Sequence, residues 1–397
     1  MSHPIPPSPH NPTTANAVAT PPCTQVVWAD PARHAAFDAW LAPLVANHQL
    51  RTETLRPASA DASFRRYLRI DSASNASAGD RSTGASLIVM DAPPDKENCQ
   101  PFVHVQQLMA AAGLNVPQIL AWDAPNGFML LSDLGHQTLI ELLDPEKPQD
   151  AYAWYQQATD VLLQWQMASQ PGVLPAYDEA LLRRELSLFP EWYLAQHRGV
   201  TLNAEQQTTL NTAFDAIVAQ NLAAPSVFVH RDFMTRNLMV PTLPAAHGLL
   251  PGGGLITPGE GRLGVLDFQD AVYGPITYDI ASLMRDAFIS WEEDLVLDIT
   301  IRYWQRARKA GLPVGDDFGE FYRSVEWMGL QRHLKVAGIF ARLTLRDGKP
   351  KYLADAPRFM RYIRTTADRY RQLGPLLRML DQIEGTEPAV GFAYGRM

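Results

Sequence analysis

The fold of this chain is decided by V-F-V-H-R-D-F-M-T-R-N-L-M-V at residues 227–240 and L-G-V-L-D-F-Q at residues 263–269. The first stretch runs from an apolar segment into Asp232, reaches Asn237 five residues later and becomes apolar again. The second places Asp267 directly after another apolar run. Short runs of β-branched and apolar residues predict strands. A carboxylate and an amide therefore lie on one tight loop, with a second carboxylate at the end of a neighbouring strand.

These three side chains match what phosphoryl transfer requires. Transfer from ATP needs an acceptor hydroxyl held in line and metal ions that mask the phosphate charge. We expect Asp232 to accept the proton of the attacking hydroxyl, and Asn237 and Asp267 to bind Mg²⁺ on the nucleotide. H-x-D-x-x-x-x-N alone arises by chance, and an Asp beside an Arg is more often a surface pair. The two stretches together favour a catalytic site over a structural turn.

Length and composition restrict the classes of protein. With 397 residues, 46% of them hydrophobic, the chain is long enough for two domains that share a cleft. A net charge of −8 argues against a general nucleic-acid binder. The Arg-rich residues 358–371 are spaced by apolar residues and read as a solvated helix face. Cys23 and Cys99 form neither C-x-x-C nor a disulfide framework, so we expect a cytoplasmic protein.

The beginning of the chain predicts a disordered tail. Residues 1–22 contain seven prolines among Ala, Thr, Ser and His, and they lack the basic start and apolar core of a signal peptide. We expect residues 1–29 to be disordered. No window approaches eighteen uninterrupted apolar residues, so we expect no membrane-spanning helix. We also expect no nucleic-acid, membrane or obligatory protein partner.

The hydrophobic pattern changes along the chain from strands to helices. The early part predicts a helix at 31–48, strands at 63–70 and 86–90, a helix at 101–113, and strands at 116–122 and 127–131. From Thr138 onward helical patterns dominate. The pattern predicts an α+β fold with a small antiparallel-sheet N-lobe at 30–133 and a mostly helical C-lobe at 134–397. Within the C-lobe, the Pro- and Gly-rich residues 241–262 predict a flexible insertion.

Longer phrases of the sequence carry a resemblance to a known family. They are D-A-S-F-R-R-Y-L-R at 61–69, V-M-D-A-P-P at 89–94, L-L-S-D-L-G at 130–135 and M-G-L-Q-R-H-L-K-V-A-G-I-F at 328–340. Together with the catalytic stretches, they resemble the anomeric N-acetylmuramate/N-acetylglucosamine kinases of the aminoglycoside phosphotransferase-like superfamily. The resemblance covers roughly residues 30–385. It implies a bilobal protein-kinase fold and ATP-dependent phosphorylation of the C1 hydroxyl of an amino sugar during peptidoglycan recycling.

The resemblance also implies a structural brace for the catalytic loop. Asp279 in G-P-I-T-Y-D-I-A-S-L looks like the bracing Asp of the family's G-D-P-x-x-D-L-A element, although Ile276 stands where that element has its first Asp. His230, at the start of the catalytic loop, is expected to belong to the same brace. Asp279 also suits a helix N-cap, and both roles can hold together.

The segments expected to bind the nucleotide differ from the usual kinase sequence pattern. The second predicted strand ends L-I-V-M-D, which places Met90 where an ATP-pairing Lys is usual. The helix that follows offers only Gln106 and Gln107 where the Glu partner of that Lys is expected. Because both the Lys and the Glu of the usual ion pair are absent, no unpaired charge is buried. We therefore expect another residue to bind the phosphates.

Several residues are candidates for binding the nucleotide. Arg65, Arg66 and Lys96 can replace the missing cation, and strand alternation allows at most one of Arg65 and Arg66 to face the nucleotide. A surface role remains open for each. In place of a G-x-G loop, Ser63 and Phe64 offer a hydroxyl and backbone N–H groups to phosphate. Adenine is expected near the backbone of Leu131 and Asp133 at the predicted hinge.

The sugar needs hydrogen-bonding side chains and an apolar wall. The segment around Glu185, Glu191 and Trp192 can supply them, with Glu191 accepting from hydroxyls and Trp192 stacking on the ring. Arg332 and His333 form the second candidate group, and Arg332 or Arg342 could bind a lactyl carboxylate. Each has a structural alternative: Trp192 and His333 suit a core, and Glu191 suits a solvated helix.

Two other functions remain open from the sequence. The same scaffold could phosphorylate an aminoglycoside or a choline-like alcohol, although no acidic cluster for a cationic substrate is evident. A catalytically weak nucleotide-binding regulator is suggested by Met90, and the three intact catalytic side chains argue against it. The short interval between Asp267 and Asp279 leaves no room for the activation segment of a protein kinase.

Overall fold

The computed structural model describes residues 26–60, 64–73, 86–241 and 261–385. The predicted tail up to residue 25 and most of the predicted insertion, residues 242–260, lie outside the described residues. The chain divides into two compact units. The first takes its described residues from 1–97 and 120–131, and the second from 98–119 and 132–397.

The first unit is built on a five-stranded sheet with the order β1-β2-β3-β5-β4. Its strands are β1 (Leu50–Ala60), β2 (Arg66–Ser72), β3 (Ser86–Asp91), β4 (Ile119–Asp123) and β5 (Phe128–Ser132). The pairs β1–β2 and β2–β3 are antiparallel. Strand β1 is not among the strands predicted from sequence. It contains Pro57 and alternates charged with polar residues, which suits the edge position that it occupies.

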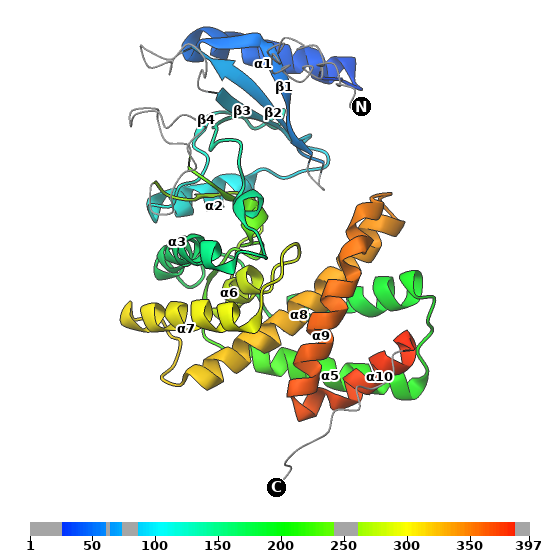
Figure 1. The fold of residues 1–397 in the computed structure, drawn as a ribbon. Coiled ribbons are helices and arrows are strands. Elements are labelled where there is room, and N and C mark those ends of the chain that lie inside the picture. The colour runs from blue at the N-terminus through cyan, green and yellow to red at the C-terminus, as the bar shows by residue number, and fades with distance from the viewer. Residues whose placement is uncertain (1–25, 61–63, 74–85, 242–260, 386–397) are drawn as a thin grey trace, which may run out of the picture. The chain divides into compact units, whose positions relative to one another are not determined.

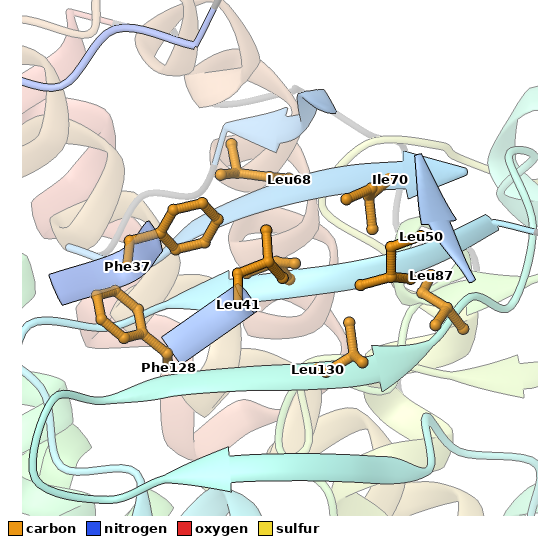
Figure 2. Packing of buried hydrophobic residues seen from close by; sticks show 9 residues of the cluster. Phe37, Leu41, Leu50, Leu68, Ile70, Leu87, Phe128 and Leu130 are labelled. Atoms are coloured by element: carbon orange, nitrogen blue, oxygen red, sulfur yellow. The ribbon is translucent and has the colours of Figure 1, made fainter. Parts of the chain in front are cut away.

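Helix α1 (Pro31–His48) covers one face of this sheet. Its side chains Phe37 and Leu41 lie over alternate residues of three strands, as Figure 2 shows. These strand residues are Leu68 and Ile70 of β2, Leu87 and Val89 of β3, and Phe128 and Leu130 of β5. Because side chains alternate along a strand, the residues between them point to the opposite face.

The catalytic stretches form two small antiparallel ribbons in the second unit. Strand β6 (Ser226–Val229) pairs with β9 (Val272–Pro275), and β7 (Leu238–Met239) pairs with β8 (Gly264–Val265). The predicted catalytic strands are confirmed, and β9 is an additional strand that the sequence analysis did not include. The loop with Asp232 joins β6 to β7, and Asp267 follows β8.

Helices make up most of the second unit (Figure 1). The α-helices are α2 (Gln100–Ala111), α3 (Pro148–Met167), α4 (Glu179–Leu188), α5 (Ala204–Leu222), α6 (Thr277–Met284), α7 (Glu293–Lys309), α8 (Phe318–Leu345), α9 (Ala356–Arg369) and α10 (Gly374–Glu384). Short helices of other types are η1 (Leu139–Leu142), η2 (Phe189–His197), η3 (Thr235–Asn237), η4 (Pro350–Asp355) and η5 (Arg371–Leu373). Among the described helices, none is long and apolar enough to cross a membrane.

The helical residues 179–197 form two segments rather than one continuous α-helix. An α-helix, α4, is followed by the π-helix η2. The change coincides with Pro190, whose missing N–H cannot continue the α-helical hydrogen bonding. Helix α8 crosses this junction closely: a Cβ on Gly338 would lie 2.3 Å from the carbonyl oxygen of Leu188. Only glycine fits there, so α8 packs directly on the α4–η2 backbone.

Candidate active site

The start of the catalytic loop is held by a carboxylate from another element, which accepts hydrogen bonds from two backbone N–H groups. Asp279 on α6 accepts from the N–H of His230 at 2.7 Å and from the N–H of Arg231 at 3.0 Å. Arg231 has a φ of 77°, a left-handed conformation that is uncommon outside glycine. Asp279 is buried, and burial raises its pKa to about 6 although His230 and the two N–H groups favour the charged form. Asp279 therefore holds a strained turn directly before Asp232.

Asn237 connects the catalytic loop with the second carboxylate. Its Nδ2 donates to the carbonyl oxygen of Asp232 at 2.9 Å and to Oδ2 of Asp267 at 3.2 Å. Oδ1 of Asp267 accepts from Nε2 of Gln269 at 2.9 Å. The structure thus brings together the three residues that the sequence singles out.

Asn237 and Asp267 are suitable ligands for Mg²⁺. Because the amide nitrogen of Asn237 donates to the protein, its amide oxygen is the atom available to a cation. Hard oxygens from one amide and one carboxylate fit a magnesium ion that keeps water and phosphate ligands. Within the described part of the chain, no group of three or more His, Cys, Asp or Glu could hold a metal ion by itself. The remaining ligands would therefore come from the nucleotide and water.

His230 fixes the loop through both ring nitrogens. Its Nδ1 lies 3.2 Å from the N–H of Asp232, and its Nε2 lies 3.0 Å from the carbonyl oxygen of Leu266. Burial lowers the pKa of His230, although neighbouring carboxylates oppose the shift, and this favours the neutral ring. The neutral ring then accepts at Nδ1 and donates at Nε2. His230 consequently ties the catalytic loop to the residue before Asp267.

A second buried carboxylate holds the other end of the loop. Asp286 accepts from the N–H of Thr235 at 3.0 Å and from its hydroxyl at 2.7 Å through Oδ2. Its Oδ1 accepts from the N–H of Phe288 at 2.9 Å. Burial raises the pKa of Asp286 despite these donors. The sequence analysis missed this residue. Asp286 lies two residues after the end of α6, and no local pattern in the sequence marks it as a partner of Thr235.

The side chain of Arg231 enters a buried network of charges. Oε1 of Glu185 on α4 accepts from Arg231 at 2.6 Å and from Lys335 on α8 at 2.9 Å. The hydroxyl of Tyr177 donates to Oε2 of the same carboxylate. Burial alone raises the pKa of Glu185, but Lys335 and Arg231 outweigh it and lower the pKa to about 2. Glu185 therefore links two helices to the residue before the candidate base.

The predicted nucleotide residues divide between the two units. Ser63 lies outside the described residues. In the first unit, Phe64 is 63% exposed and the guanidinium groups of Arg65 and Arg66 form different ion pairs, with Glu97 and Asp91 respectively. Leu131 is buried in β5. In the second unit, Asp133 accepts from the N–H of Gly135 at 3.0 Å.

The two groups of predicted sugar residues differ in exposure. On η2, Glu191 is exposed and Trp192 is partly exposed. On α8, Arg332 and His333 are buried, and Arg342 is partly exposed. The guanidinium of Arg332 lies 5.3 Å from the ring centre of Tyr278.

His333 has well-defined neighbours inside the second unit. Its Nε2 lies 3.2 Å from the carbonyl oxygen of Arg285, and its ring stacks on Tyr362 at 4.6 Å. Burial lowers the pKa of His333 to about 3. Burial therefore favours a structural role for this ring, and the predicted sugar contacts of α8 stay predictions.

The kinase-like fold and the hydrogen-bonded group of Asp232, Asn237 and Asp267 fit a phosphotransferase. Residues 54–316 match the family described as "Phosphotransferase enzyme family", and the chain belongs to that family. A solved choline/ethanolamine kinase family protein from Mesorhizobium loti shares the fold, with a TM-score of 0.55 and 16% identity. The match covers 88% of this chain and 99% of that protein.

Two curated relatives identify the group within the family to which the chain belongs. The N-acetylmuramate/N-acetylglucosamine kinase of Pseudomonas aeruginosa is 49% identical over 331 residues, which are 83% of this chain and 89% of the relative. The enzyme of the same name from Neisseria meningitidis is 47% identical over 339 residues, 85% of this chain and 93% of the relative. The chain is thus a member of the N-acetylmuramate/N-acetylglucosamine kinase group. The predicted family, fold class and kinase activity are confirmed.

Proposed function

We propose that this protein transfers the γ-phosphoryl group of ATP to the anomeric C1 hydroxyl of N-acetylmuramate and N-acetylglucosamine. The observation that carries the proposal is the hydrogen-bonded cluster of Asp232, Asn237 and Asp267 in this chain. Two curated relatives named N-acetylmuramate/N-acetylglucosamine kinase, at 49% and 47% identity, support it. Its place is in cell-wall recycling, where recovered amino sugars are returned to use. A choline-like acceptor, an aminoglycoside or a regulatory role has no comparable support.

In the proposed reaction, Asp232 accepts the proton of the C1 hydroxyl as its oxygen attacks the γ-phosphorus. The bond between that phosphorus and the bridging oxygen of ADP breaks, and ADP leaves. Asn237 and Asp267 would hold Mg²⁺, which masks the negative charge of the phosphates. Asp279 and Asp286 position the base by holding the backbone on either side of it.

The proposal keeps the binding residues that are expected from the sequence. For the nucleotide, the proposal retains Ser63, Phe64, Leu131, Asp133 and one of the two cations Arg65 and Arg66. For the sugar, it retains Glu191 and Trp192 on η2, with Arg332 and His333 on α8. The exposure of Glu191 and Trp192 supports direct sugar contact. A cytoplasmic location is part of the proposal, because the chain would draw on cytosolic ATP.

An assay of ADP release tests the proposed acceptor. Magnesium ATP is offered with N-acetylmuramate, N-acetylglucosamine, the C1-blocked methyl glycosides of both sugars, choline and an aminoglycoside. We expect turnover with the free sugars and none with the methyl glycosides, because blocking C1 removes the attacking hydroxyl. Equal turnover of the glycosides would refute attack by C1, and turnover of choline alone would refute the acceptor class.

A further inference from the structure

The two faces of the sheet in the first unit have different partners. Leu68 and Ile70 of β2 lie on the face that α1 covers, so Arg66, two residues earlier, lies on that face as well. Tyr67 lies on the opposite face. In the β2–β3 register Tyr67 is opposite Met90, which therefore shares its face. Met90 is the residue at the position of the usual ATP-pairing Lys.

Arg66 already has a structural role on the α1 face. Its Nε donates to Asp91 at 2.9 Å, and Arg33 of α1 donates to the other oxygen of the same carboxylate at 2.8 Å. The guanidinium of Arg66 also lies 4.3 Å from the ring centre of Trp28. Asp91 is 1% exposed, so this carboxylate needs both cations. Arg66 consequently ties α1 to the sheet.

Arg65 directly precedes β2, and continuing the alternation of the strand by one residue puts it on the side of Tyr67 and Met90. Its guanidinium pairs with Oε2 of Glu97 at 3.2 Å, while Oε1 of Glu97 accepts from the N–H of Phe64 at 3.0 Å. The side chains of Arg65 and Glu97 are 10% and 13% exposed. One carboxylate therefore holds both the backbone and the cation at the start of β2. Glu97 lies three residues before helix α2 begins.

We propose that Arg65, oriented by Glu97, is the cation that binds the phosphates of ATP in place of the absent Lys. This inference rests on the proposed function and identifies the residue pair that binds the nucleotide of the proposed kinase. In kinases generally, a Lys on the sheet is oriented by a Glu of the following helix. Here the cation comes from the residue directly before the neighbouring strand, and the carboxylate comes from just before the following helix.

The chemistry of the pair suits this role. A guanidinium has a planar fork of donors that matches the oxygens of a phosphate, and the ion pair with Glu97 orients that fork in Arg65. Lys96, beside Glu97 in sequence, lies 5.2 Å from the ring centre of Phe64 and adds a second positive charge to the same place. Arg65, Lys96 and Glu97 therefore leave a net positive charge for an anionic ligand.

Equilibrium binding of adenosine, ADP and ATP to the full chain tests the proposal. Arg65→Gln is expected to weaken ATP binding by about 10- to 100-fold, the effect of one lost charge-assisted contact, and adenosine binding by less than twofold. Arg65→Lys keeps the charge without the fork and should give an intermediate loss. Arg69→Gln is the matched control: it lies in β2 on the face of Tyr67, changes the charge equally and should leave all three affinities unchanged.

The comparison of ligands separates a phosphate contact from a structural one. If Arg65→Gln weakens the binding of adenosine as much as the binding of ATP, Arg65 only supports the fold of the sheet and the proposal fails. Unchanged ATP affinity would overturn it as well. Glu97→Gln should weaken ATP binding by a smaller factor than Arg65→Gln, because it removes orientation but leaves the cation. No sugar enters these measurements, so their outcome is independent of whether the proposed acceptor is correct.

Discussion

The catalytic loop and the start of β2 hold their polar groups in different ways. Around the catalytic loop, Asp279 and Asp286 are almost fully buried and accept from backbone N–H groups. Directly before β2, the Arg65–Glu97 ion pair retains some exposure, although Glu97 also accepts from the N–H of Phe64. Buried acceptors of backbone donors fix a loop before any ligand arrives, whereas an ion pair can exchange a partner. The chain thus combines a preset catalytic loop with a proposed phosphate-binding pair that can adjust.

The largest expected effect comes from the base itself. Asp232→Asn removes the proton acceptor and should lower kcat by about 10²- to 10⁴-fold, the usual contribution of a general base. Its backbone partners, His230 and Asn237, remain in place, so ATP affinity should change little. Steady-state kinetics with N-acetylmuramate test the fall in kcat, and equilibrium binding of ATP tests the unchanged affinity. A variant with unchanged kcat would remove Asp232 from the mechanism.

The next effect concerns the support beneath the loop. Glu185→Gln leaves Arg231 and Lys335 as buried cations without their carboxylate, which should lower the free energy of unfolding by about 3–5 kcal/mol. Glu179→Gln on the same helix is the control, because its pair with Arg183 is exposed and should change stability by less than about 1 kcal/mol. Denaturant unfolding measures both. Equal small effects would show that Glu185 does not support the loop.

The same network predicts a dependence of stability on pH. Folding lowers the pKa of Glu185 from 4.5 to about 2, so its contribution is present above pH 4.5 and is lost as the pH falls toward 2. The stability difference between wild type and Glu185→Gln should therefore shrink across that window, by about 3 kcal/mol at most. Unfolding measured between pH 5 and pH 2.5 checks this. A difference that stays constant would contradict the assigned network.

The smallest expected effect tests the second clamp of the loop. Thr235→Val removes the hydroxyl that donates to Asp286 but keeps the backbone donor, so unfolding should become easier by about 1 kcal/mol. Thr208→Val on α5 is the control, since its exposed hydroxyl bonds only within the helix. Because Asp286 positions the loop, kcat should fall modestly while ATP affinity is retained. A larger loss from Thr208→Val would contradict the clamp.

The same contrast explains what the sequence could predict. Asp232, Asn237 and Asp267 were predictable because their chemistry is set by short spacing between apolar runs. Asp279 was found through a resemblance, and its contacts with the loop are those expected of a brace. The fold class followed from the change between strand and helix periods. Local pattern was therefore sufficient for the chemistry and the architecture.

The supporting residues were not predictable because each contacts a residue that is far away in the sequence. Glu185 reaches Arg231 across 46 positions, Asp286 reaches Thr235 across 51, and Glu97 reaches Phe64 across 33. No local pattern connects such pairs. Strand β1 was missed because Pro57 and its charged residues are unlike a core strand, and only the sheet order shows that it is an edge. Partners of this kind need the tertiary structure.

The central claim is transfer of phosphate to the anomeric hydroxyl, and the phosphorus-31 spectrum of the product tests it most directly. The protein is incubated with magnesium ATP and N-acetylmuramate, and the product is examined for coupling between phosphorus and the anomeric proton. We predict a sugar phosphate with that coupling and without a reducing end. A product that keeps its reducing end and couples to protons elsewhere on the sugar would contradict the account.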